Sequence, residues 1–149
     1  EAIEQLRTLL GVVRDDPSND RTPVPTVDEL PGLAARSTAA GFRVDLDIAG
    51  EPRPLSPQLQ ASLFRVAQEG IANAMKHSGA HACRIRVQYQ ADCVVVQVED
   101  DGQHSHSSSV GSQLGLVGIR ERAAAFGGRV DVGPRPSGAG WLLEVAFPA

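Results

Sequence analysis

Two neighbouring segments of alternating polarity restrict the fold of this chain more than any other feature. Residues 82–90 and 93–100 carry apolar side chains at every second position, with Ala91-Asp92 between them. A two-residue turn there predicts an antiparallel hairpin of defined register. One face then pairs Tyr89 with Val94, Val87 with Val96 and Ile85 with Val98, and the other pairs Arg84 with Glu99 and Arg86 with Gln97. Because Cys83 and Cys93 are out of register, we expect no disulfide.

Three helices and three further strands are predicted around this hairpin. The helices span about residues 26–40, 57–77 and 114–126, and the strands about 42–48, 129–133 and 140–147. Thr26 and Ser56 are suited to cap the first two helices, and Pro57 takes the first helical position after Ser56. Helices and strands that alternate around an antiparallel hairpin predict an α+β fold, a two-layer α/β sandwich.

The length and composition favour one soluble domain with a short N-terminal extension. Residues 1–14 open in the middle of a helical pattern and suggest the end of a longer helix, residues 15–25 form a linker, and residues 26–149 form the domain. The formal charge of −4 argues against a nucleic-acid surface, and no run approaches the ~18–20 apolar residues of a membrane span. Two unpaired cysteines indicate a reducing cytoplasm.

The helix predicted at residues 57–77 carries a polar cluster on one face. Its members fall within an arc of about 100°, opposite an apolar side, and they are Glu69, Asn73, Lys76 and His77. This set suits a magnesium-triphosphate, because Mg²⁺ prefers oxygen ligands and cationic side chains neutralise phosphate. An ordinary solvated helix face would show the same pattern, so both interpretations stay open from this helix alone.

Two further elements carry candidate binding residues. Asp100 and Gly102 follow the second strand of the hairpin, where a carboxylate can accept a hydrogen bond from an adenine amine. Gly115 and Gly118 lie at the start of the predicted third helix, where the backbone can approach phosphates. Asp-x-Gly is also a common turn, and a lone glycine pair is weak evidence. The order and spacing of all three elements are more specific.

Together these segments resemble the nucleotide-binding boxes of bacterial two-component sensor histidine kinases. The segments are RVAQEGIANAMKHSGA, VEDDG and GLVGIRERAAAFGG, and the resemblance covers roughly residues 55–147. It is greatest to the subclass whose partners are helix-turn-helix response regulators. The wider superfamily includes gyrase and other type II topoisomerases, the large heat-shock chaperone and the mismatch-repair ATPase. Its fold has a mixed, mainly antiparallel sheet with three helices on one face.

The resemblance implies that the chain binds ATP and Mg²⁺. The implied nucleotide-binding residues are Asn73, Lys76, His77, Asp100, Gly102, Gly115, Leu116 and Gly118. Among them Asn73 would ligate magnesium, Lys76 and His77 would lie near the phosphates, and Asp100 would bind the adenine amine. Gly115, Leu116 and Gly118 would form the end of a lid over the phosphates. Glu69 would be the catalytic carboxylate.

The implied activity is transfer of the γ-phosphate to a histidine on a dimerisation domain, whose last helix residues 1–14 resemble. That histidine should precede residue 1, because none of His77, His81, His104 and His106 is a good candidate. The implied partners are this dimerisation domain and a response regulator, with no direct nucleic-acid contact. The parent would be a homodimeric, membrane-anchored sensor with this domain in the cytoplasm, and the fragment could be monomeric.

The chain departs from the family pattern at two positions. Gln113 stands where the first glycine of the lid motif Gly-x-Gly-Leu belongs, and Trp141 follows Gly140 where the family often has threonine. Two alternatives therefore remain: a serine kinase of the anti-sigma type, or a degenerate interaction module that no longer binds ATP. His104 and His106 could suggest a metal, but a solvent-exposed loop composition explains them better.

Overall fold

The structure, a computed structural model, describes residues 24–77, 80–102, 110–135 and 140–149, without the side chains of His77 and residues 110–115. The predictions for residues 1–14 and for most of the linker lie outside this range. The strands are β1 (Arg43–Ala49), β2 (Ala82–Tyr89), β3 (Cys93–Asp100), β4 (Arg129–Pro134) and β5 (Trp141–Pro148). The helices are a short 3₁₀ helix, η1 (Val27–Glu29), and α2 (Leu30–Ala39), α3 (Pro57–His77) and α4 (Val110–Ala125).

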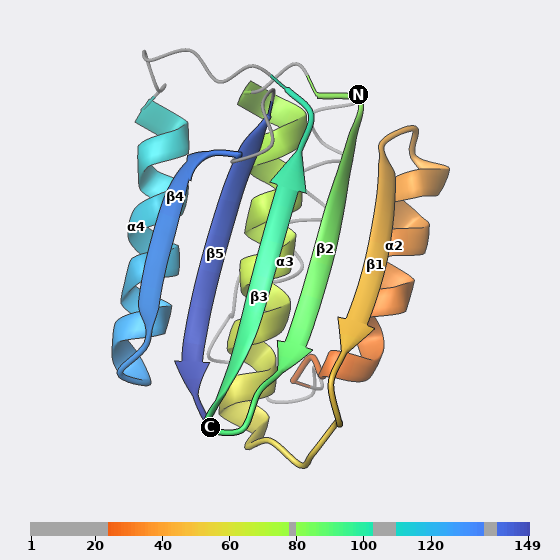
Figure 1. Ribbon diagram of the computed structural model, residues 1–149. Helices are drawn as coiled ribbons and strands as arrows, with labels where there is room; N and C mark the ends of the chain where they lie inside the picture. Colours follow the sequence, from red (N-terminus) through yellow and green to blue (C-terminus); the bar gives the residue numbers. More distant parts are fainter. Residues whose placement is uncertain (1–23, 78–79, 103–109, 136–139) are drawn as a thin grey trace.

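The described part of the chain forms the predicted α+β sandwich. The five strands form one sheet in the order β1-β2-β3-β5-β4. β1 is parallel to β2, and every other neighbouring pair is antiparallel. The three α-helices cover one face of the sheet (Figure 1). This arrangement confirms the mixed, mainly antiparallel sheet and the single helical layer.

The hairpin of β2 and β3 has the predicted register. Ile85 pairs with Val98, Val87 with Val96 and Tyr89 with Val94, and the polar partners face each other as expected. The amide N–H of Gln90 donates to the carbonyl of Cys93 at 2.9 Å, which closes the two-residue turn. Both cysteines are free thiols. The alternation of polar and apolar residues was therefore sufficient to predict the centre of the sheet.

The first predicted helix is interrupted near its start. Residues 27–29 form η1, and α2 begins only at Leu30. Pro31 has no N–H with which to bond the carbonyl of Val27 in the α pattern. The N–H of Leu30 bonds to that carbonyl instead, which tightens the first turn into a 3₁₀ helix.

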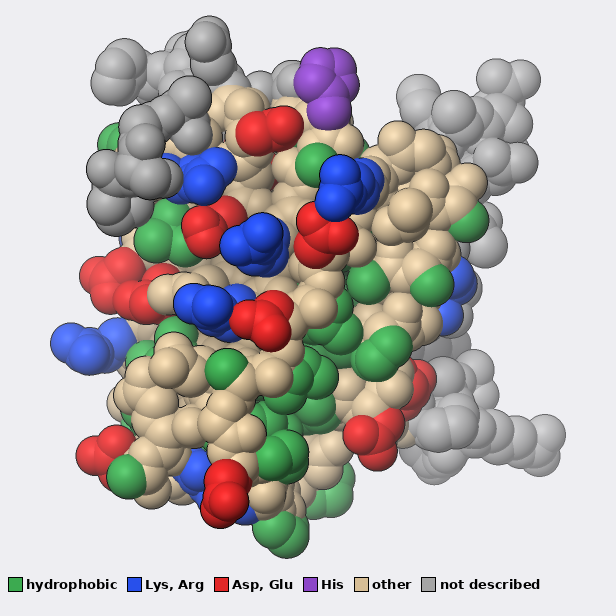
Figure 2. Space-filling model, turned by 45° about the vertical axis from the view of Figure 1, so that its right-hand side comes forward, with side chains coloured by type: hydrophobic (Ala, Val, Ile, Leu, Met, Phe, Trp, Pro, Cys, Tyr) green, Lys and Arg blue, Asp and Glu red, His purple; other side chains and the backbone are tan. Residues whose placement is uncertain are grey.

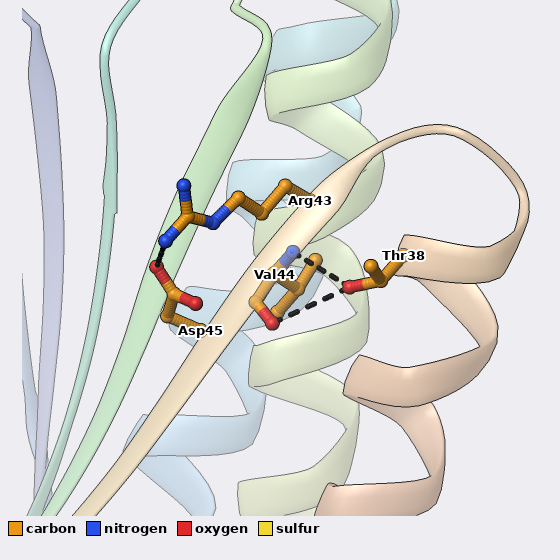
Figure 3. Close-up of polar contacts among 4 residues, drawn as sticks. All are labelled: Thr38, Arg43, Val44 and Asp45. Atoms are coloured by element: carbon orange, nitrogen blue, oxygen red, sulfur yellow. Dashed lines mark hydrogen bonds and ion pairs between the residues drawn. The ribbon is translucent and has the colours of Figure 1, made fainter.

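Threonine 38 joins α2 to the edge strand. Its hydroxyl accepts a hydrogen bond from the N–H of Val44 at 3.0 Å and lies 3.5 Å from the Val44 carbonyl (Figure 3). Gly41, with φ of 105°, makes the turn between the two elements. Arg43 and Asp45, both outward-facing, form an ion pair at 3.3 Å (Figure 3).

The core lies between the sheet and the helices, and the opposite face of the sheet is polar. The largest fully buried side chains are Phe147, Leu30, Leu63, Ile85, Ile119, Val66, Val87, Val94, Val96 and Val145. Acidic and basic side chains alternate over the uncovered face (Figure 2). One pair there is Arg86 and Asp47, 3.1 Å apart. Within the described residues, no helix is long and apolar enough to cross a bilayer.

Glycine 70 allows α3 to pack closely on the sheet. A Cβ atom at this position would lie 2.7–2.9 Å from three side-chain atoms of Val98. Real Cβ atoms do not approach carbon this closely, so a side chain at position 70 would push α3 away from β3. The close approach brings the C-terminal half of α3 alongside the end of β3.

We expect Gly70→Ala to destabilise the domain by up to about 2 kcal/mol, because overpacking costs about 1–3 kcal/mol and the gain in helix propensity offsets only about 1 kcal/mol of it. Gly32→Ala is the matched control. Its Cβ would meet only the tip of the Arg36 side chain, at 3.1 Å. Urea unfolding should show a lower midpoint for Gly70→Ala and an unchanged or higher one for Gly32→Ala. Equal stabilities would contradict the close packing of α3 on β3.

Candidate functional site

The elements that carry the candidate residues meet at one end of the molecule. The C-terminal end of α3, the C-terminal end of β3 and the N-terminal end of α4 lie together at the top of Figure 1. α3 packs against both β3 and α4. Residues separated by more than 40 positions in the sequence therefore form one neighbourhood, as their order along the chain suggested.

The polar face of α3 is available to a ligand. Glu69 and Asn73 are half-buried and Lys76 is exposed, whereas the opposite side of the helix is buried against the sheet. Among the described residues, no side-chain hydrogen bond or ion pair engages Glu69, Asn73 or Lys76. His77 is the last residue of α3, but its side chain lies outside the described part. The helix thus presents a carboxylate and an amide one turn apart, followed by an ammonium group.

Aspartate 100 is a buried carboxylate at the end of β3. Only 7% of the residue is exposed, although its neighbour Asp101 is exposed. The N–H of Gly102 donates to Oδ1 of Asp100 at 2.9 Å. This bond turns the chain sharply after the strand, and Gly102 is itself buried. The arrangement holds the Asp100 carboxylate in one orientation on the helix-facing side of the sheet.

Asp101 is a positioning residue that the sequence analysis did not identify. Its Oδ1 accepts the N–H of His81 at 3.1 Å and that of Ala82 at 3.4 Å. These bonds tie the turn after β3 to the segment that enters β2 from the end of α3. In the sequence, only the acidic pair Asp100-Asp101 could have indicated this role of Asp101. An acidic pair next to glycine is also typical of an ordinary turn, so the role could not be predicted.

A cross-strand row runs through the site on the helix-facing side of the sheet. In this row Cys83 pairs with Asp100, and Asp100 pairs with Trp141. Cys83 is buried, and burial raises the pKa of its thiol from 9.0 to about 12. The nearby carboxylates of Asp100, Asp45 and Asp101 add to this shift, since each disfavours the thiolate. Cys83 is therefore a neutral thiol at neutral pH and not a nucleophile.

Ionisation of Cys83 should make the fold less stable at high pH. The pKa of this thiol is raised on folding, so its stabilising contribution is complete below pH 9.0 and is lost as the pH rises toward about 12. We expect the free energy of unfolding to fall more steeply above pH 9.0 in the wild type than in Cys83→Ala. Urea titrations at a series of pH values measure this, and parallel curves for the two proteins would contradict it. Other titrating groups, such as Tyr89, are shared by both proteins.

The candidate glycines of the segment GLVGIRERAAAFGG lie inside a helix and not at its start. α4 begins at Val110, four residues before the predicted start, so Gly115, Leu116 and Gly118 lie within its second and third turns. The prediction of a helix N-terminus at these glycines was wrong, because the low helix propensity of Gly111 and Ser112 did not prevent helix formation. Leu116 packs against the core. A Cβ at Gly118 would meet only the tip of Arg122, at 3.0 Å, so protein packing does not demand glycine there.

The oxygen atoms on the polar face of α3 suit magnesium. No group of three or more His, Cys, Asp or Glu side chains within the described ranges could hold a metal ion. Asn73 and Glu69 offer oxygen atoms from one face of α3. Mg²⁺ is commonly held by one or two protein oxygens, with waters and substrate phosphates completing its coordination. Asn73 could therefore hold Mg²⁺ when a nucleotide is also bound.

Comparisons with known proteins agree with this arrangement. The family model described as "Histidine kinase-, DNA gyrase B-, and HSP90-like ATPase" matches residues 58–149. The sensor histidine kinase LnrJ of Bacillus subtilis is 27% identical over 130 residues, which cover 87% of this chain and 31% of LnrJ. The histidine-protein kinase/phosphatase UhpB of Salmonella typhimurium is 31% identical over 129 residues, covering 87% of this chain and 26% of UhpB. The chain thus spans less than a third of either relative.

Solved structures show the same fold. The blue-light-activated histidine kinase of Erythrobacter litoralis EL346 superposes with a TM-score of 0.65 at 16% sequence identity, covering 83% of this chain and 42% of that one. The match over residues 58–149 includes α3, β3 and α4, which carry the candidate residues. The chain therefore belongs to the family of histidine kinase-, DNA gyrase B- and HSP90-like ATPases, as the ATP-binding catalytic domain of a sensor histidine kinase.

Proposed function

We propose that this domain binds Mg-ATP beside α3 and Asp100 and transfers the γ-phosphate to a histidine of a dimerisation domain. One observation carries the proposal. The buried Asp100 carboxylate lies at the same end of the molecule as the polar face of α3, whose side chains Glu69, Asn73 and Lys76 have no side-chain hydrogen bond or ion pair among the described residues. A fixed carboxylate can recognise the base, while an amide and a cation can serve the phosphates. Family membership supports the ATP-binding part of this assignment.

Each candidate residue takes one role in this proposal. Asp100 accepts a hydrogen bond from the adenine amine, and Gly102 lies beneath the base. Asn73 ligates Mg²⁺, which when bound neutralises charge on the phosphate oxygens. Lys76 and His77 lie near the phosphates. Gly115, Leu116 and Gly118, the end of the proposed lid, touch the phosphates from α4.

The transfer step requires positioning more than covalent chemistry from the protein. A nitrogen of the acceptor imidazole attacks the γ-phosphorus, the bond to the bridging oxygen breaks, and ADP leaves. Glu69 orients this imidazole or accepts its proton, because it lies one helical turn before Asn73. The half-buried position of the Glu69 carboxylate fits either role.

The proposed partners are the dimerisation domain of the parent kinase and a response regulator of the helix-turn-helix type. The parent is a homodimeric sensor anchored in the membrane, with this domain in the cytoplasm. The relatives support a parent kinase longer than this chain, because the chain covers only 31% of LnrJ and 26% of UhpB.

Phosphate transfer in trans tests the function. The chain is mixed with radiolabelled ATP, Mg²⁺ and an excess of the separately produced dimerisation domain of the parent. We expect label on that domain that is lost in acid and retained in base, as phosphohistidine requires, and none when its histidine is replaced. Label that survives acid would indicate a serine kinase of the anti-sigma type. If the chain binds ATP but transfers label to neither histidine nor serine, the transferase proposal is contradicted.

A further inference from the structure

The strand next to Asp100 carries a large aromatic side chain. Trp141 is the first residue of β5 and pairs with Asp100 in the antiparallel register. Side chains alternate along a strand, so Trp141 shares a face with the buried residues Leu143, Val145 and Phe147. Asp100 and Trp141 therefore both project toward the helices, and directly opposed Cβ atoms lie about 4.5–5.5 Å apart.

The backbone determines where Trp141 lies relative to Asp100. Gly140 has a φ of 119°, and a Cβ atom at this position would collide with the backbone oxygen of Asp100. The carbonyl of Gly140 accepts the N–H of Arg135 at 3.1 Å, which closes the β4–β5 connection at its base. Glycine is thus required for β5 to begin tightly against the end of β3. Trp141 follows directly from this contact.

Trp141 retains accessible surface although it projects toward the core side. Leu143, Val145 and Phe147 on the same face of β5 are 5%, 0% and 0% exposed, whereas Trp141 is only partly buried. Trp141 is therefore the least covered of these four positions on β5, and it lies beside the buried Asp100. A hydrogen-bonding carboxylate and a partly buried tryptophan are thus direct neighbours on adjacent strands.

We propose that Trp141 forms an aromatic wall of the base site beside Asp100 and makes the site selective for purine nucleotides. This inference rests on the proposed binding of ATP at Asp100. The carboxylate recognises the exocyclic amine, and the indole contacts the ring of the base. Aromatic contacts of this kind contribute substantially to base binding, and a purine offers the larger surface.

Tryptophan fluorescence reports directly on this site, because Trp141 is the only tryptophan in the chain. We expect ADP to change the emission of the wild type in a saturable way, with the same Kd as calorimetry. Trp141→Thr should weaken ADP binding roughly 5- to 100-fold, and Trp141→Phe should retain most of the affinity. The preference for ADP over CDP should shrink in Trp141→Thr. Leu142→Thr, on the opposite face of β5, should leave both affinities unchanged.

Magnesium tripolyphosphate separates contacts to the base from contacts to the phosphates. Its affinity should be the same in the wild type and in Trp141→Thr, with circular dichroism confirming that each variant is folded. ADP binding by calorimetry without a change in emission, or with equal or higher affinity in Trp141→Thr, overturns the assignment of Trp141 alone. The absence of any ADP binding to the wild type overturns the proposed function itself. If the threonine variant does not fold, the emission of the wild type decides alone, because Trp141 is the only tryptophan and its emission must change as ADP saturates the site.

Discussion

Asp100→Asn should weaken adenine nucleotide binding by at least about 100-fold. A hydrogen bond to a charged group contributes about 1.5–3 kcal/mol, and an unpaired buried partner costs roughly a further 1–3 kcal/mol. The asparagine oxygen can keep the bond from the N–H of Gly102, which Oδ1 of Asp100 now accepts at 2.9 Å. Its NH₂ group then replaces an acceptor with a donor. The NH₂ group of the asparagine would then face the adenine amine, and both are donors. The loss of affinity should therefore be specific to nucleotides that carry this amine.

Glu99→Gln is the matched control for this change. It makes the same replacement of a carboxylate by an amide one residue earlier, on the opposite face of β3. Glu99 is 3.6 Å from Arg135, and its loss should alter nucleotide affinity by no more than about twofold, since a partly exposed ion pair contributes little. Calorimetry with ADP measures both variants. Equal affinities for Asp100→Asn and Glu99→Gln would show that Asp100 does not recognise the base.

Asn73→Ala should remove the strengthening of nucleotide binding by magnesium. If the Asn73 side-chain oxygen ligates the ion, its loss leaves Mg²⁺ bound only through phosphates and water. We expect the variant to bind an ATP analogue with the same Kd whether or not Mg²⁺ is present, close to the magnesium-free Kd of the wild type. Asn73→Asp retains an oxygen at this position and should restore part of the effect.

Gln58→Ala provides the control on the same helix. It removes an exposed amide 15 residues earlier, which is about 22 Å along the axis of α3 at 1.5 Å per residue. The Kd of Gln58→Ala for the ATP analogue should depend on Mg²⁺ as strongly as that of the wild type. A persistent magnesium effect in Asn73→Ala would show that another group ligates the ion, with Glu69 as the nearest oxygen donor on that face.

The parts of the fold that local chemistry determines could be predicted from the sequence. Ser56 caps α3 by accepting the N–H of Leu59 at 3.1 Å, and the structure has the predicted helix over residues 57–77. The alternation in β2 and β3 determined their register, which also places Cys83 opposite Asp100. Helical periodicity alone was sufficient to predict the polar face of α3.

Other features depended on tertiary contacts that no local pattern reveals. The start of α4 was missed because the poor helix propensity of Gly111 and Ser112 did not prevent helix formation at these residues. The pairing of Asp100 with Trp141 joins strands that are far apart in the sequence, so the neighbourhood of Trp141 could not be predicted. The backbone bonds accepted by Asp101 come from the entry into β2, another non-local contact. The close approach of Gly70 to Val98 likewise exists only in the folded protein.

Calorimetric titration of an ATP analogue into the purified domain, with and without Mg²⁺, tests the central claim most directly. The account predicts saturable binding to a single site, strengthened by Mg²⁺ and lost in Asp100→Asn. No heat of binding at millimolar nucleotide, or binding that Asp100→Asn and Asn73→Ala leave unchanged, would contradict it.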